Sequence, residues 1–123
     1  MASAIGWYGV DSAEKIFIET DLPAKDFLGQ TCNQWEDALK PIAKLGIRIV
    51  SVRVGIVLSN AGGALVAFKK SLKYGIAAIL SSGKQIISWI HIIDLVRLFT
   101  FILQHESLQG SFNAVAPKPV SNK

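Results

Sequence analysis

The chain has 123 residues, a formal net charge of +4, 50% hydrophobic residues and 18% charged residues. This composition supports a buried core and excludes a disordered chain, while the length suits one small domain or part of a larger one. The lysines are scattered apart from Lys69, Lys70 and Lys73, and no basic stripe alternates with aromatic residues, so we expect no nucleic-acid partner.

The cellular setting is predicted from three further sequence features. Cys32 is the only cysteine, which excludes an internal disulfide and favours a reducing compartment. The apolar runs are shorter than the roughly 18 residues that a membrane span needs. The N-terminal residues lack a basic segment followed by an apolar block, which is the pattern of a signal peptide. We therefore expect a cytoplasmic protein with no membrane partner.

The first half of the chain predicts two short strands and a helix. Residues 1–9, MASAIGWYG, are typical of the end of a buried strand followed by a glycine turn, and residues 15–19, KIFIE, of a second short strand. Apolar residues recur at three- and four-residue spacing over 27–45, which predicts a helix with Asp26 as its N-cap and Gly46 as its stop. Pro41 lies inside that span and predicts a kink or an early break.

The second half continues the alternation of strands and helices. Residues 47–58, IRIVSVRVGIVL, are nearly continuous in apolarity, as expected of a strand buried on both faces of a parallel sheet. Gly62 and Gly63 open a helix that Gly75 closes, and SSGK at 81–84 forms a turn. The remaining elements are a strand at 85–92 (QIISWIHI), a helix at 94–104 and a short strand at 110–117 (GSFNAVAP). This order predicts an α/β layered domain.

Two ionisable residues, His91 and Asp94, lie in the apolar run SWIHIIDLVRLF. We expect Asp94 to cap the following helix, because its carboxylate can accept the free N–H groups of the first turn. We expect His91 to be a neutral imidazole with one backbone partner, with a proton shuttle as the alternative. His105 lies at the far end of the same helix, so no metal site is expected.

Three further features have a functional and a simpler interpretation. The stretch GGAL at 62–65 can offer backbone N–H groups to a phosphate, although a flexible loop is the simpler interpretation. The lysines at 69, 70 and 73 are most simply a solvated helix face, with contact to a phosphorylated ligand as the alternative. Arg53 lies in a predicted buried strand, where a guanidinium needs a carboxylate or phosphate partner because burying it alone is costly.

Several motifs together resemble one known family. They are SAIGWYG, FLGQTCNQWEDAL, VRVGIVLSNAGGAL, SGKQIISWIHIIDLVRLFTFIL and GSFNAVAPKPVSN. Their order and spacing resemble the atypical branch of the extended short-chain dehydrogenases/reductases, the NAD(P)-dependent epimerase/dehydratase-like or nucleoside-diphosphate-sugar epimerase proteins. The resemblance covers nearly the whole chain.

The resemblance implies part of a Rossmann-type, doubly wound parallel sheet. Family members hold the dinucleotide pyrophosphate on a glycine-rich turn after the first strand, and no G-x-x-G-x-x-G motif occurs in these 123 residues. We therefore expect residues 1–123 to be a single fragment, with the late Rossmann strands and the substrate-side elements but without the N-terminal glycine-rich half. The cofactor of the intact protein would be NAD or NADP.

The resemblance also suggests site residues. In the wider superfamily a Tyr-x-x-x-Lys pair transfers the proton, but Leu28 and Cys32 occupy those positions if Glu36 aligns with the acidic residue that follows the pair. Cys32 is a conceivable nucleophile, although a small apolar helix position is the simpler interpretation.

Ser3, or Ala4 in the neighbouring register, matches the substrate-contacting serine of the family. Tyr8 is a candidate surrogate acid, with pocket lining as its alternative role. Arg53, Val54 and Gly55 match the segment that reaches the nicotinamide end of the cofactor.

One departure from the family pattern bears on the mechanism. The family carries an acidic residue where this chain has Ile93, and the retained Asp94 favours a helix cap over a pair of catalytic carboxylates. The predicted function is that of an NAD(P)-dependent epimerase/dehydratase-like oxidoreductase, acting on a small molecule such as a nucleotide sugar and inactive as this chain alone. The alternatives are a non-catalytic NAD(P)-binding or sensor protein, and an interaction module completed by a partner chain through its exposed sheet edge.

Overall fold

The structure is a computed structural model that describes residues 1–9, 15–72 and 85–121, without the side chains of residues 71 and 72. Three parallel strands form its central sheet in the order β1-β2-β6: β1 (Ala2–Ala4), β2 (Val50–Val54) and β6 (Gly110–Ala114). Ala4, Val54 and Ala114 lie side by side across the sheet, so the carboxyl ends of the three strands meet at one edge.

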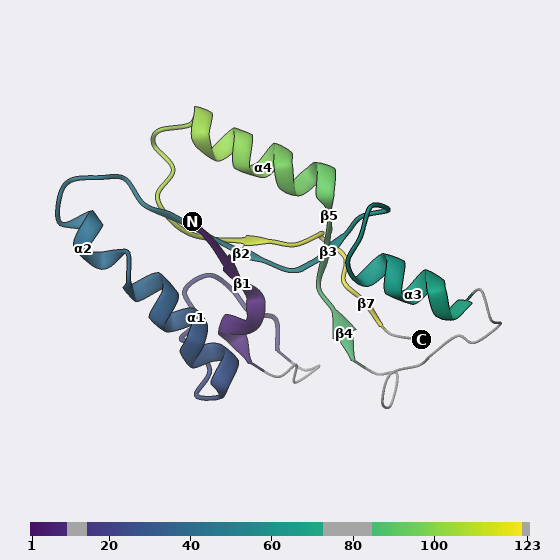
Figure 1. The fold of residues 1–123 in the computed structure, drawn as a ribbon. Helices are drawn as coiled ribbons and strands as arrows, with labels where there is room; N and C mark the ends of the chain where they lie inside the picture. The colour runs from purple at the N-terminus through teal and green to yellow at the C-terminus, as the bar shows by residue number, and fades with distance from the viewer. Residues whose placement is uncertain (10–14, 73–84, 122–123) are drawn as a thin grey trace.

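Two smaller sheets and four helices complete the described part of the chain. β3 (Ile56–Leu58) pairs in parallel with β5 (Trp89–His91), and β4 (Ile86–Ile87) pairs antiparallel with β7 (Val120–Ser121). The helices are α1 (Phe27–Asp37), α2 (Lys40–Ala43), α3 (Ala64–Leu72) and α4 (Ile92–Gln104), and a 3-10 helix spans Ile5–Tyr8. Figure 1 shows α1 and α4 on opposite sides of the central strands. The predicted α/β class with a parallel sheet is confirmed.

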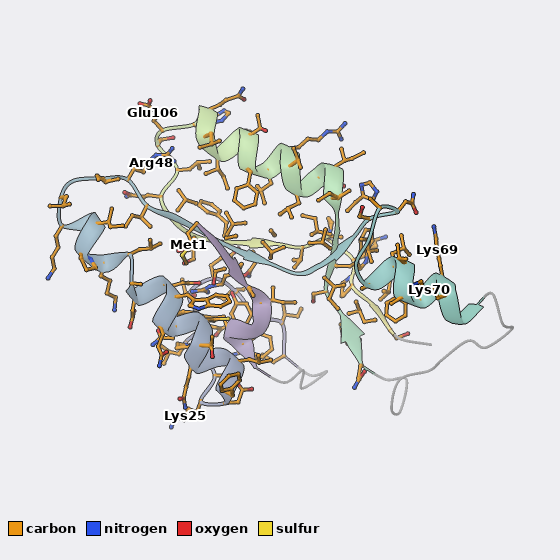
Figure 2. All side chains as sticks on the ribbon, viewed as in Figure 1. Met1, Lys25, Arg48, Lys69, Lys70 and Glu106 are labelled. Carbon is orange, nitrogen blue, oxygen red and sulfur yellow. The ribbon has the colours of Figure 1, made fainter. Side chains whose placement is uncertain are left out.

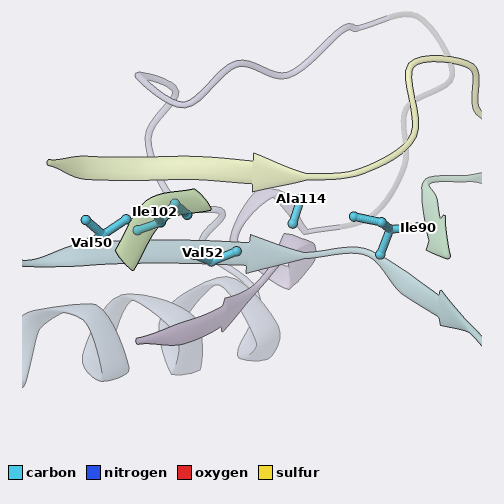
Figure 3. Close-up of a cluster of buried hydrophobic side chains, with 5 residues drawn as sticks. All are labelled: Val50, Val52, Ile90, Ile102 and Ala114. Carbon is cyan, nitrogen blue, oxygen red and sulfur yellow. The ribbon is translucent and has the colours of Figure 1, made fainter. Parts of the chain in front are cut away.

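The two faces of the central sheet have different chemistry because side chains alternate along a strand. Val50 and Val52 of β2 pack with Ile102 of α4 and Ala114 of β6 in the main apolar core, which also includes Ile90 (Figure 3). Val52 is only 1% exposed. The intervening residues Ser51 and Arg53 are also buried, and the Arg53 side chain reaches α1 on the other face. The apolar layer therefore lies between the sheet and α4, and a polar layer lies between the sheet and α1.

The expected continuous strand over 47–58 is wrong, because the chain breaks at Gly55 into β2 and β3. The Gly55 amide donates to Ala114 O at 3.1 Å, whereas the next amide, that of Ile56, donates to Ser88 O at 2.9 Å. The backbone thus changes partners between two sheets within one residue. A Cβ atom on Gly55 would lie 2.6 Å from Ser88 O and 2.9 Å from Val115 Cγ1, so a side chain does not fit there. The expected strand over 85–92 is divided in the same way, at Ser88.

The helix expected over 27–45 is divided into two, while its predicted N-cap, early break and glycine stop are confirmed. The Asp26 carboxylate caps α1 by accepting from the Gly29 amide at 2.8 Å. The helix ends at Asp37, four residues before Pro41, and a separate short turn, α2, follows. The early end has a physical cause, since a proline lacks an N–H group and its ring clashes with the carbonyl four residues earlier. Gly46 ends this segment with a φ of 78°.

The predicted cap of the last helix is wrong. α4 begins at Ile92, and its N-cap is His91, whose Nδ1 accepts from the Ile93 amide at 3.3 Å. The half-buried His91 thus has the single backbone partner that was expected. The helix begins two residues earlier than predicted, so Asp94 lies in its first turn. There it forms an exposed pair with Arg97 at 3.5 Å and still interacts favourably with the helix dipole.

The strand expected at residues 15–19 does not form. Asp21 holds this segment as a loop, because its carboxylate accepts from Lys15 Nζ and from the Ile18 amide, both at 2.9 Å. Ile16 is 90% exposed, so the apolar residues of this segment do not form a buried strand. Phe17 instead stacks on Tyr8, with ring centroids 5.0 Å apart.

The basic residues on the third helix are exposed, as predicted. Lys69 and Lys70 extend from α3 in Figure 2, and Lys69 Nζ donates to Asn60 Oδ1 at 2.6 Å. Lys73, the expected helix end at Gly75 and the turn at 81–84 lie outside the described residues. Among the helices of the described ranges, none is both long enough and apolar enough to cross a lipid bilayer.

Replacing Gly55 with alanine should destabilise the fold, because the added Cβ would overlap Ser88 O. We expect the free energy of unfolding to fall by about 1–3 kcal/mol, the usual cost of forcing extra atoms into a packed site. Urea unfolding followed by tryptophan fluorescence measures this change.

Gly62→Ala is the matched control, since a Cβ there meets no atom within 4 Å. That variant should stay within about 0.5 kcal/mol of the unmodified chain. Equal stability of the two variants would show that the crowding at Gly55 is not a constraint.

Candidate functional site

A buried ion pair, Arg53–Glu36, lies at the centre of the polar layer between the sheet and α1. Arg53 Nε donates to Glu36 Oε1 at 2.9 Å, and Arg53 Nη2 donates to Glu36 Oε2 at 3.0 Å. The side chains are 3% and 11% exposed, respectively. This bidentate geometry suits the planar guanidinium group, and charge-assisted pairs of this kind are among the strongest side-chain hydrogen bonds. The predicted carboxylate partner of Arg53 is therefore Glu36.

The remaining contacts of Arg53 also lie within the chain. Nη1 donates to Tyr8 Oη at 3.1 Å and to Glu19 O at 3.0 Å. The guanidinium carbon lies 3.7 Å from the centroid of the Trp7 ring, in cation–π geometry. The Arg53 side chain is thus committed to internal contacts on several sides.

Hydroxyl groups from two strands also contact the Glu36 carboxylate. Ser3 Oγ of β1 donates to Oε1 at 2.8 Å, and Ser111 Oγ of β6 donates to Oε2 at 3.4 Å. Tyr8 Oη donates in turn to Asn113 Oδ1 at 2.7 Å. Among the described residues, no buried side-chain nitrogen or oxygen lacks a hydrogen-bond partner. We refer to Ser3, Tyr8, Glu36, Arg53, Ser111 and Asn113 as the polar network.

Strand register and helix packing together bring the polar network into one place. Ser3, Arg53 and Asn113 lie in one row across β1, β2 and β6, so their side chains leave the same face of the sheet. α1 packs closely against the loop before it at Gly29. A Cβ atom on Gly29 would lie only 2.3 Å from Ala24 O, so only glycine allows this approach. Glu36, near the end of α1, reaches this row and contacts Ser3 and Arg53.

Electrostatics keep both members of the central pair charged. Burial by itself raises the pKa of the Glu36 carboxyl, but the hydrogen bonds from Arg53 and Ser3 and the charge of Arg53 outweigh it, and the pKa is lowered. Burial likewise acts to lower the pKa of Arg53, and the contacts with Glu36 and Tyr8 reverse this, so its pKa is raised.

Cys32 lies beneath the 3-10 helix as a buried apolar residue, together with Trp7 and Tyr8. It is 4% exposed, and burial raises the pKa of its thiol above the ordinary value of 9.0. A raised pKa disfavours the thiolate, which is the nucleophilic form. The simpler interpretation of Cys32, a small packing residue, fits this environment.

The structure brings together three of the five predicted site residues. Ser3, Tyr8 and Arg53 share the polar network, and the Ser3 and Tyr8 hydroxyls are engaged by Glu36, Asn113 and Arg53. Val54 lies instead at the carboxyl end of β2, and Gly55 follows it between β2 and β3. The Gly55 amide is already bonded to Ala114 O. The part of the chain that the structure describes has no group of three or more side chains suited to hold a metal ion.

Sequence reasoning did not find Glu36, Ser111 or Asn113 as members of the site. A signal was present in the strands, because a single polar residue interrupts apolar neighbours at every second position of VSVRV and GSFNA. That alternation indicates one polar face. The partner of Arg53 was harder to identify, since Glu36 comes from a helix and depends on how α1 packs on the sheet.

The chain is similar over almost its whole length to parts of longer proteins. An epimerase family protein of Mycobacterium bovis is 40% identical over 121 residues, which cover 98% of this chain and 40% of that protein. One from Staphylococcus aureus is 43% identical, covering 96% of this chain and 39% of the relative. The chain thus spans about two fifths of the length of these relatives. A comparison with models of protein families found no match.

Solved structures give the same result for the fold. The nucleoside-diphosphate sugar epimerase of Corynebacterium glutamicum matches with a TM-score of 0.90 at 37% identity, covering 98% of this chain and 26% of that one. Human epimerase family protein SDR39U1 (isoform 2), solved with NADPH, matches with a TM-score of 0.87 at 30% identity, covering 98% and 41%.

The fold and its parallel strands are therefore those of Rossmann-type epimerases, as the sequence predicted. More particularly, the chain is related to the epimerase family proteins and corresponds to about two fifths of their length.

Removing the guanidinium from the polar network should cost far more stability than breaking a surface pair. We expect Arg53→Ala to lower the free energy of unfolding by about 3–5 kcal/mol, since Glu36 would remain buried without its partner. Arg97→Ala breaks the exposed Asp94 pair and should cost less than about 1 kcal/mol. Arg53→Lys keeps the charge but loses the paired hydrogen bonds, so it should fall between them. Urea unfolding would contradict this ranking if Arg53→Ala cost no more than Arg97→Ala.

The same pair predicts a dependence of stability on pH. Because the pKa of Glu36 is lowered in the folded state, the unfolded chain binds the proton more readily. The stabilisation is complete above the ordinary carboxyl pKa of 4.5 and is lost as the pH falls through the folded-state value. The stability difference between the unmodified chain and Glu36→Gln should therefore shrink below pH 4.5. An unchanged difference down to pH 3 would contradict the role of the carboxylate charge.

Proposed function

We propose that residues 1–123 form the late Rossmann strands and substrate-side elements of an NAD(P)-dependent epimerase/dehydratase-like oxidoreductase. The observation that supports this most strongly is the match of 98% of the chain to two epimerase structures with TM-scores of 0.90 and 0.87. The human relative was solved with NADPH. The proposed cofactor is NAD or NADP, and the proposed reaction is hydride transfer to and from its nicotinamide ring.

The placement of Val54 and Gly55 supports their proposed contact with the cofactor. Ligands of open parallel sheets bind outside the carboxyl ends of the strands, and both residues lie at that edge. For Arg53 we propose an indirect contribution, because its side chain already binds Glu36, Tyr8 and Glu19.

The proposed catalytic residues are Ser3 and Tyr8, since the first long helix offers no Tyr/Lys pair. Leu28 is 57% exposed and Cys32 is buried, and neither side chain can replace a phenol or an ammonium group. Tyr8 Oη already has a hydrogen-bond donor in Arg53 and an acceptor in Asn113, which are the connections that a proton-transferring group needs. Ser3 would orient the substrate from the same face. A nucleotide sugar is the proposed substrate class, and the cytoplasm the proposed compartment.

Tyr8→Phe tests this assignment in a longer protein that carries this sequence together with a glycine-rich Rossmann half. We expect hydride exchange to slow by about 100-fold or more with NADPH affinity unchanged, because only the hydroxyl is removed. Phe17→Leu is the control, since it alters the ring stacked on Tyr8 and leaves the hydroxyl. Cofactor fluorescence titration and exchange from labelled NADPH measure the two quantities.

Each outcome of this experiment has a distinct meaning. Equal exchange by Tyr8→Phe and the unmodified protein would remove Tyr8 from the mechanism.

The 123-residue chain by itself should neither bind NADPH tightly nor exchange hydride, since it contains no G-x-x-G-x-x-G motif. Tight binding by that chain would contradict the proposal that the cofactor needs a glycine-rich half.

A second candidate function is a non-catalytic NAD(P)-binding or sensor protein. The observation that favours it is the polar network itself, in which Ser3 and Tyr8 are buried and engaged by other side chains. Tight NADPH binding without hydride exchange over a broad substrate panel would support this alternative.

An interaction module completed by a partner chain is a third candidate. α1 exposes apolar side chains, with Phe27 at 80%, Leu28 at 57% and Trp35 at 52% exposure, and β1 lies at an edge of the central sheet. Exposed apolar surface and a free strand edge both promote association, including association between copies. A monodisperse monomer in light scattering would contradict it.

A further inference from the structure

An apolar cavity lies at the end of the molecule opposite α1, and the polar network does not use it. It has a volume of about 370 Å³, within the range of roughly 300–1,000 Å³ that small-molecule sites have. Figure 1 shows the elements that surround it, α3, β3, β4 and β7, gathered away from α1. The side chains that line it are Ile56, Leu58, Leu65, Phe68, Ile87, Trp89 and Val120.

The chemistry of this lining is uniform. Every lining side chain is a hydrocarbon except Trp89, whose indole N–H donates to Lys118 O at 3.2 Å. The lining side chains therefore offer no charge and no uncommitted N–H or O–H donor. A phosphate or a sugar hydroxyl placed here would lose water without gaining a hydrogen bond from any of these side chains, which is costly. A hydrocarbon group would gain from the same burial.

The cavity also lies next to the proposed cofactor edge. Ile56 follows Gly55 directly in the chain, and Trp89 pairs with Ile56 across β3 and β5. A molecule seated in the cavity would therefore approach the sheet within a residue or two of the position proposed for the nicotinamide ring. This proximity joins the cavity to the proposed reaction.

We propose that this cavity binds an uncharged apolar group of the substrate, so that the substrate carries an aliphatic or aromatic portion. This inference rests on the proposed function for its link to a reaction and deepens it by naming a substrate class. The phosphates and hydroxyls of a nucleotide sugar would have to lie outside this cavity, because its lining side chains cannot hydrogen-bond them. Binding of the apolar group itself needs only the described lining residues.

Benzene is a suitable probe, because it is an uncharged hydrocarbon that forms no hydrogen bonds and gains from burial against apolar side chains. NMR spectra of the ¹⁵N-labelled 123-residue chain resolve the indole signals of its three tryptophans, and Trp89→Phe assigns one of them. We expect benzene to shift the Trp89 signal saturably and to leave those of Trp7 and Trp35 in place. UDP-glucose should not shift the Trp89 signal.

Two matched variants test whether the cavity is the site. Leu65→Phe adds ring atoms to the cavity and should weaken benzene binding about tenfold or more, since a filled pocket buries less ligand. Val96→Phe makes the same class of change on α4, where Val96 is 56% exposed, and should leave the affinity unchanged. If Leu65→Phe does not fold, Ile87→Phe fills the cavity from β4 instead.

Three results would overturn the proposal. Saturable shifts of Trp89 with UDP-glucose but not benzene would make the cavity a nucleotide-sugar site. Equal, unsaturable shifts of all three indoles would show general partitioning of benzene, and equal affinities of Leu65→Phe and Val96→Phe would exclude this cavity. These results are independent of the NADPH titration. NADPH binding by the longer protein without a benzene response of the 123-residue chain overturns the cavity proposal only. A benzene response without NADPH binding by the longer protein overturns the cofactor proposal only.

Discussion

Arg53 is the next-to-last residue of β2 and its side chain is only 3% exposed, so a carboxylate has to meet the guanidinium inside the protein. The carboxylate of Glu36 does so from α1, 17 residues earlier in the chain. Burying this pair is favourable only when its other hydrogen-bonding positions are also occupied. Ser3, Ser111 and Tyr8 supply those contacts, and each comes from a different element. The position of α1 on the sheet therefore depends on one ion pair and the side chains that surround it.

This constraint explains the contrast between the two faces of the central sheet. The face toward α4 is held by non-directional burial of valine, alanine and isoleucine side chains. The face toward α1 is held by directional hydrogen bonds, which require a particular geometry. A polar layer of this kind specifies how a helix sits more narrowly than an apolar layer can. The residues proposed for catalysis lie in the directional layer, where a proton can be passed along defined hydrogen bonds.

Gly55 separates the polar network from the apolar cavity. Before it, β2 pairs with β1 and β6; after it, the chain enters β3 and pairs with β5. One residue thus divides a charged, fully hydrogen-bonded region from a cavity lined by hydrocarbon side chains. The proposed cofactor edge lies between the two, at the carboxyl ends of the parallel strands. In the proposed reaction, one side supplies proton-transferring groups and the other the apolar contacts that orient a substrate.

Structural features that depend on a few neighbouring residues could be predicted from the sequence. The Asp26 cap, the helix break before Pro41 and the need of Arg53 for an anionic partner all follow from local chemistry. The cap of α4 could not be predicted, because His91 and Asp94 are both able to cap, and the point where β5 ends decides between them. The break of residues 47–58 at Gly55 could not be predicted either, because the apolar residues continue through it. Both halves are strands, and only the strands with which they pair differ.

The motifs also pointed correctly to the Rossmann-type fold and to the epimerase relatives. By itself, then, the sequence determined the class of the fold, the start of α1 and the requirement for a buried anion. Tertiary structure alone decided that the anion is Glu36, that Ser3 and Tyr8 join it, and that an apolar cavity forms beyond Gly55. The physical reason is distance along the chain: local signals act within a helical turn, whereas these contacts join residues up to 105 positions apart.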